Sequence, residues 1–142
     1  MIRLFAVLVA ASCVLFLSPV IEAAAADGPY SKINRSANDV HTPVITAPDS
    51  VKAGEPFEVT ITVGKVPHPS APDHAVQWIA LYADEVELAR ATLTPVLTRA
   101  TVTFTIALDE STTLRALEAP NHSAAWEGTK KITVTKPQEK KK

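Results

Sequence analysis

Apolar and polar residues alternate along two segments of the chain. The first segment is 57–63 and the second is 101–108. Their apolar positions are Phe57, Val59, Ile61 and Val63 in the first, and Val102, Phe104, Ile106 and Leu108 in the second. A period of two is that of a strand with one face buried and the other in solvent. Both segments are therefore predicted to be half-buried β-strands.

Other segments complete an all-β pattern. Residues 75–84 are apolar almost throughout, which is typical of a central strand covered on both faces. Further strands are predicted at 86–94, 112–118 and 130–135, and a first one within 42–51. A helical turn at 83–91 is the alternative, but Thr92 and Pro95 disfavour a long helix. About seven short strands with frequent turns predict an antiparallel, immunoglobulin-like β-sandwich.

The start of the chain has the features of a secretory signal peptide. Arg3 precedes an apolar run from Leu4 to Leu17, and small residues follow up to Ala26. We expect residues 1–26 to be removed and the protein to be periplasmic or secreted. An uncleaved anchor is disfavoured by Pro19, and lipid attachment at Cys13 is disfavoured because the next residues are strongly apolar.

Length and composition limit the number of domains and the classes of partner that the protein can have. The chain has 142 residues, enough for one domain, which we place at 39–135 between a lead-in at 27–38 and a charged tail at 136–142. The net charge of −1 gives no reason to expect a nucleic-acid or membrane-surface partner. Cys13 is the only cysteine, so after cleavage no thiol remains for a disulfide or a metal.

Four histidines are the candidate metal ligands. They stand beside prolines or at the ends of predicted strands, and loops at one end of a sandwich could bring them together. Prolines between the second and third stiffen that loop and lower the entropy lost on fixing a ligand. Neutral imidazole suits iron, copper, nickel and zinc, so spacing alone does not choose a metal. The four are His41, His68, His74 and His122.

Three segments, 41–65, 66–84 and 111–128, resemble the iron domain of the superoxide reductases, the desulfoferrodoxin and neelaredoxin family. The resemblance covers about residues 39–134 and is to the short, single-centre form. It implies an immunoglobulin-like sandwich that holds ferrous iron, Fe(2+), between four imidazoles and one axial cysteine thiolate. The four histidines of this chain fall on the imidazole positions.

The chain departs from the family at the axial ligand. The family loop reads Cys-Asn-x-His-Gly-x-Trp, and the corresponding segment here is 119–126. Counted back from His122, Ala119 replaces the cysteine. Counted back from Trp126, Pro120 replaces the cysteine and Ser123 the histidine. The first alignment is preferred because it keeps an imidazole.

A second departure precedes the first histidine. The family commonly has Glu-Lys-His there, and this chain has Asp39, Val40 and His41. Asp39 keeps a carboxylate that could approach the sixth coordination position, and it is our candidate catalytic residue. Val40 removes a positive charge that would attract superoxide.

Together these features predict an exported metal-binding protein with a four-histidine iron centre. Superoxide reduction would be weakened without the axial cysteine; water, Asn121, Glu118 or nothing could take the fifth position. The partners would then be superoxide and an unidentified electron donor, and a homo-oligomer stays open. The alternatives are a non-catalytic periplasmic binding or carrier module, or copper or nickel at the same histidines.

Overall fold

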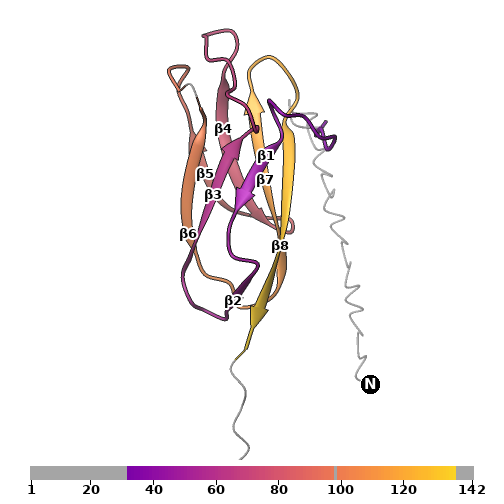
Figure 1. Ribbon diagram of the computed structural model, residues 1–142, viewed down its shortest axis with the longest axis vertical. Coiled ribbons are helices and arrows are strands. Elements are labelled where there is room, and N and C mark those ends of the chain that lie inside the picture. The colour runs from indigo at the N-terminus through magenta and orange to yellow at the C-terminus, as the bar shows by residue number, and fades with distance from the viewer. Residues whose placement is uncertain (1–31, 98, 137–142) are drawn as a thin grey trace, which may run out of the picture.

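The computed structural model describes residues 32–97 and 99–136, which form two packed β-sheets (Figure 1). One sheet has the order β1 (Pro43–Thr46), β3 (Phe57–Val63) and β6 (Thr101–Ile106). The other has the order β2 (Ser50–Lys52), β8 (Trp126–Thr135), β7 (Thr112–Pro120), β4 (Val76–Ala83) and β5 (Val86–Thr92). All pairs are antiparallel except β2 with β8, which is parallel.

This architecture confirms the predicted all-β sandwich. Residues 86–92 form a strand paired with β4, not a helical turn. No helix that could cross a membrane occurs among the described residues. The predicted signal peptide at 1–26 and residues 137–142 of the charged tail lie outside the described part of the chain.

The core lies between the sheets and follows the period-two pattern. Alternate residues of β3 are fully or almost fully buried, and they face buried residues of β4, β7 and β8. Each large apolar side chain removed from water contributes roughly 1.5–3 kcal/mol. The largest apolar members are Val59, Ile61, Val63, Ile79, Leu81, Leu114 and Ile132.

The sequence pattern missed one break. Residues 42–51 were predicted to hold one strand, but they hold two, β1 and β2, in different sheets. The chain crosses between the sheets near Pro48, which has no N–H to donate to a ladder. The sandwich therefore has eight strands rather than seven.

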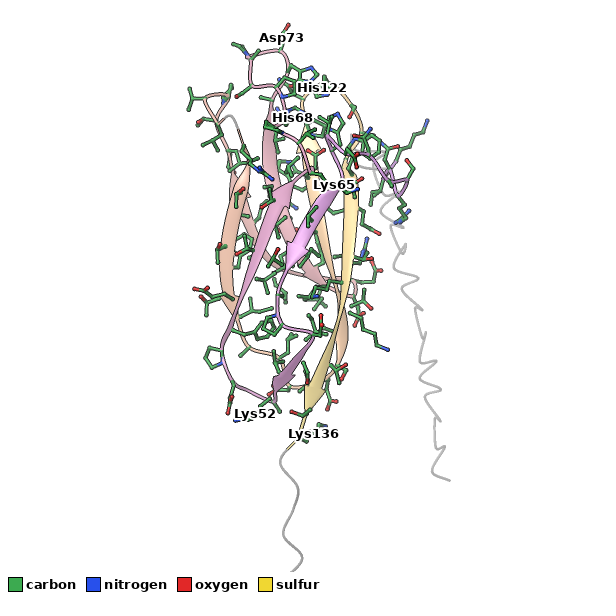
Figure 2. The ribbon with its side chains drawn as sticks, in the orientation of Figure 1. Lys52, Lys65, His68, Asp73, His122 and Lys136 are labelled. Carbon is green, nitrogen blue, oxygen red and sulfur yellow. The ribbon has the colours of Figure 1, made fainter. Side chains whose placement is uncertain are left out.

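Two strands are longer than predicted, and this shapes one end of the molecule. β7 runs on to Pro120 and β8 begins at Trp126. Both strands therefore lead directly into the loop that carries His122. The loop between β3 and β4 and the turn before β1 reach the same end (Figure 2).

Candidate metal centre

His41 is held by a turn immediately before β1. The Asn38 side-chain oxygen accepts hydrogen bonds from the backbone N–H groups of Val40 (2.8 Å) and His41 (3.0 Å). The N–H groups of Lys65 and Val66, which follow β3, donate to the Asp39 carbonyl. These bonds fix the backbone that leads into His41.

The loops that carry the other three histidines are joined by Asn121. Its side-chain oxygen accepts a hydrogen bond from the Ala75 N–H (2.9 Å), and its amide nitrogen donates to the Pro72 carbonyl (2.8 Å). Its own N–H donates to the Ala75 carbonyl (3.0 Å). Because the amide is used in this way, Asn121 is a structural link between the loops and a poor candidate for the fifth ligand.

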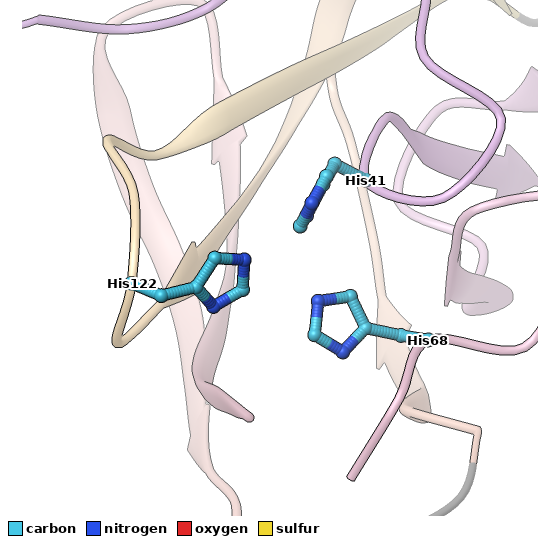
Figure 3. A group of neighbouring side chains, drawn as sticks. All are labelled: His41, His68 and His122. Carbon is cyan, nitrogen blue, oxygen red and sulfur yellow. The ribbon is translucent and has the colours of Figure 1, made fainter. Parts of the chain in front are cut away.

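Three of the predicted histidines converge. The ligand atoms of His41, His68 and His122 all lie within 4.8 Å of one another, around a common space (Figure 3). The ring centroids are 4.8 Å apart for His41 and His68, 5.3 Å for His41 and His122, and 5.5 Å for His68 and His122. Trp126 stacks on the outer side of this group, with its ring 5.2 Å from that of His41.

The fourth histidine lies beside this group. The His74 ring stacks on the His122 ring, with centroids 3.7 Å apart, and is 4.9 Å from the His68 ring. Its nitrogens do not belong to the set that lies within 4.8 Å. The structure thus gathers all four rings but brings the ligand atoms of only three together.

His68 supplies the clearest sign that this cluster fits a metal ion. Its Nδ1 lies 2.6 Å from the Pro69 carbonyl oxygen, which can only accept, so Nδ1 carries the hydrogen. Nε2 is therefore a bare lone pair. It is buried, and no described residue bonds to it. A buried polar atom without a partner costs about 1–3 kcal/mol, which a bound cation would offset.

The cluster favours neutral imidazoles, the form that binds metals. Burial, followed by the nearby rings of His68, His122 and His74, lowers the pKa of His41 to about 4. Burial is also the main cause of the lowered pKa of His68 and of His122.

Glu118 lies beneath this cluster, inside the sandwich. Its Oε1 is 3.1 Å from Nδ1 of His41, and its Oε2 is buried without a partner among the described residues. The side chain is fully buried, and burial raises the pKa of its carboxyl to about 8. Sequence reasoning named Glu118 only as one of several fifth ligands.

The register of β7 bears on the missing cysteine. Leu114 and Ala116 belong to the core, so Glu118 and then Pro120 follow on the same side of the strand. Ala119 points to the opposite side and pairs with Trp78 of β4. A side chain at 119 would face away from Glu118 and His41, so a thiolate that reached the cluster would fit better at 120. The convergence of His122 with the cluster agrees instead with the alignment that puts the cysteine at Ala119.

Asp39 is at the same end but faces solvent. Its carboxylate is 2.8 Å from the ammonium of Lys65, and both side chains are about two-thirds exposed. It is not among the grouped ligand atoms. Sequence reasoning missed Lys65, since only the strand arrangement brings residue 65 beside residue 39.

The fold and this cluster can be compared with known proteins. The sequence profile of the desulfoferrodoxin family matches residues 33–129. This chain belongs to the desulfoferrodoxin family. A superoxide reductase homologue of Thermotoga maritima is 34% identical over an alignment 124 positions long. The alignment covers 74% of this chain and 95% of that protein.

Solved structures agree with this assignment. A superoxide reductase (neelaredoxin) from Ignicoccus hospitalis is 39% identical, with a TM-score of 0.61 over 67% of this chain and 81% of that one. The sulfur carrier protein SoxY from Chlorobium limicola f. thiosulfatophilum is 14% identical, with a TM-score of 0.56 over 72% of this chain and 80% of that one. At that identity the likeness to SoxY is one of fold alone.

Proposed function

We propose that this member of the family holds an iron ion at His41, His68, His74 and His122 and reduces superoxide with it. The observation that supports this most directly is the buried, unpartnered Nε2 of His68 beside the rings of His41 and His122. His74 stands next to His122 and would be the fourth ligand after a change of side-chain rotamer.

The residues around the cluster would prepare it for this role. Ferrous iron would supply the one electron that superoxide needs, and two protons would come from solvent to give hydrogen peroxide. The lowered pKa values keep the imidazoles neutral and free to bind. Lys65 and Asp39 lie at the solvent side as an ion pair, where Lys65 would attract an anion and Asp39 would supply a carboxylate beside it.

The absent thiolate would weaken this activity. A thiolate ligand donates electron density to iron and changes how a bound oxygen species reacts. Neither Ala119 nor Pro120 can donate in this way, and Asn121 is occupied. We therefore expect slower superoxide reduction than in a thiolate-ligated centre.

The first test is the iron content of the protein, with the visible spectrum before and after exposure to superoxide. We expect about one iron per chain, lost in His68→Ala, and oxidation of the ferrous protein by superoxide. Iron that is bound but inert to superoxide would refute the reductase and leave the metal site.

Two cysteine variants test the missing ligand. Pro120→Cys should add a thiolate absorption band to the ferric protein and speed the reaction with superoxide. Ala119→Cys is the matched control and should do neither, because residue 119 pairs with Trp78 and its side chain lies on the opposite side of β7 from Glu118. The opposite result would support the alignment that replaces the cysteine with Ala119.

A second candidate function is copper or nickel binding at the same residues. Four imidazoles without a thiolate favour Cu(II), which binds nitrogen ligands more tightly than ferrous iron does. Equilibration of the protein with equal amounts of Fe(2+), Ni(2+) and Cu(2+), followed by metal analysis, measures this preference. The fold shared with SoxY keeps a non-catalytic carrier open, and absence of every stoichiometric metal would support it.

We also propose that the protein is exported after cleavage near residue 26. The sequence pattern of residues 1–26 supports this proposal. The intact mass of the protein recovered from the periplasm or medium tests it, and an uncleaved chain in the cytoplasm would contradict it.

A further inference from the structure

Glu118 combines three properties that are rare for a carboxylate. Its side chain is fully buried, one oxygen contacts His41, and the other oxygen has no partner among the described residues. Within residues 32–97 and 99–136, no Arg or Lys side chain, the usual companion of a buried carboxylate, forms an ion pair with it. Burial raises the pKa of this carboxyl, so its ionised form needs a positive charge nearby, which a metal ion in the cluster would supply.

We infer that Glu118 is the counter-charge of the metal centre: a positioning residue that holds His41 through Nδ1 and supplies the negative charge that a thiolate ligand would otherwise bring. This inference rests on the proposed function, since it needs a metal ion in the cluster. It assigns the charge to a residue behind the ligands rather than among them.

The geometry separates this role from direct ligation. The group of ligand atoms within 4.8 Å of one another contains three imidazoles and no carboxylate from the described residues. Glu118 instead meets the Nδ1 side of His41. When the carboxylate accepts from Nδ1–H, the hydrogen is fixed there and Nε2 is left bare to bind a metal.

Two histidines are therefore prepared in the same way by different acceptors. His68 directs Nδ1 to the neutral Pro69 carbonyl, while His41 directs Nδ1 to a carboxylate. An ionised acceptor makes its imidazole the stronger electron donor. Only the bond from His41 therefore adds a full negative charge to the centre.

The charge should matter more for ferric than for ferrous iron, since a trivalent ion is attracted more strongly. Removing it should weaken Fe(3+) binding more than Fe(2+) binding and so raise the reduction potential. A residue that merely shaped the site would weaken the binding of both ions equally. The ratio of the two affinities thus separates charge from shape.

The experiment compares the full chain with Glu118→Gln, which keeps a hydrogen-bond acceptor without the charge, and Glu118→Met, which removes both. Glu58→Gln on the exposed face of β3 is the matched control. Fe(2+) affinity is measured by anaerobic competition with a chelator, the reduction potential by spectroelectrochemistry, and the metal-free thermal midpoint by circular dichroism.

We expect Glu118→Gln to lower Fe(2+) affinity about 10-fold and Fe(3+) affinity at least 10-fold further. The metal-free midpoint should stay the same or rise, because an unsatisfied buried carboxylate is gone. Glu118→Met should lose more Fe(2+) affinity, and Glu58→Gln should lose none.

Equal potentials in wild type and Glu118→Gln, both loaded with iron, would overturn the inference and leave the proposed function intact. A loss of metal-free stability in both Glu118 variants, with an unchanged affinity ratio, would also overturn it and make Glu118 structural. A wild-type chain that binds no iron would instead refute the proposed function, and the inference with it.

Discussion

The two ends of the sandwich differ in whether their polar side chains are buried or exposed to solvent (Figure 2). At the end that carries the histidines, polar atoms are buried, and two of them, His68 Nε2 and Glu118 Oε2, have no partner in the described part of the chain. At the other end, charges stay in water as exposed ion pairs, such as Lys52 with Glu55 and Lys136 with Glu110. An open hollow there is lined by residues such as Ser50, Pro56 and Phe57.

This difference indicates at which end polar side chains lower the stability of the fold. Exposed pairs cost little and contribute little. Buried unpartnered atoms are costly, and each calls for an explanation such as a bound ion. The histidine end therefore carries the candidate site.

The largest contrast is expected between two glycines with positive φ. A Cβ on Gly64 (φ 66°) would lie 2.7 Å from the Asp39 carbonyl oxygen and closer still to that of Val40, whereas a Cβ on Gly54 (φ 72°) meets nothing nearer than 3.7 Å. Gly64→Ala should lower the free energy of unfolding by about 3 kcal/mol or more, and Gly54→Ala by roughly 1 kcal/mol. Chemical denaturation measures both free energies of unfolding. Equal losses in the two variants would contradict the prediction that the two ends differ.

Metal removal should act mainly at one end. A ligand that binds only the folded state stabilises it by about 2.7 kcal/mol at one hundred times its Kd. Amide hydrogen exchange, with and without iron, should show the largest local change at residues 38–42, 66–75 and 121–126. Equal changes around Lys52 and Glu55 would show that the ends are not independent.

Acid should remove a contribution of His41 to the stability of the metal-free protein, whereas protonation of Glu118, whose pKa burial raises to about 8, acts in the opposite direction. The pKa of His41 is about 4 in the fold against an ordinary 6.5, so the unfolded chain binds the proton first as the pH falls. The stabilising contribution of His41 is present above pH 6.5 and is lost between 6.5 and 4, by about 3 kcal/mol. Denaturation midpoints across this range in wild type and His41→Phe test it; parallel curves would contradict the prediction.

The smallest effect is expected at the opposite end. Lys52→Ala breaks a pair whose side chains are 71% and 60% exposed, so the free energy of unfolding should fall by less than about 1 kcal/mol. Iron affinity should not change. A measurable loss of iron would mean that the ends communicate through the sheets.

The fold was predictable where burial alone sets the pattern. Apolar and polar residues alternate in β3 and β6 because one face of each strand packs on the core. This alternation can be recognised in the sequence alone. The split of 42–51 was missed because each half has strand-like residues, although Pro48 between them is a break signal. Pairing with β3 and with β8 places the two halves in different sheets.

The candidate centre was predicted in part. The resemblance to the family selected the four histidines, and the structure brings the ligand atoms of His41, His68 and His122 together. The orientations of Glu118 and Ala119 were not accessible, because strand register decides which faces inward. The contact of Lys65 with Asp39 joins residues 26 positions apart, and it too required the fold.

The three hydrogen bonds made by Asn121 give the site a kinetic property. They tie the loop of His74 to the loop of His122, so the two move as one body. The ordering entropy of the two loop backbones is then lost when the chain folds, before any ion arrives. Loading should be a single fast event rather than a stepwise search, and release should await the local opening of both loops together.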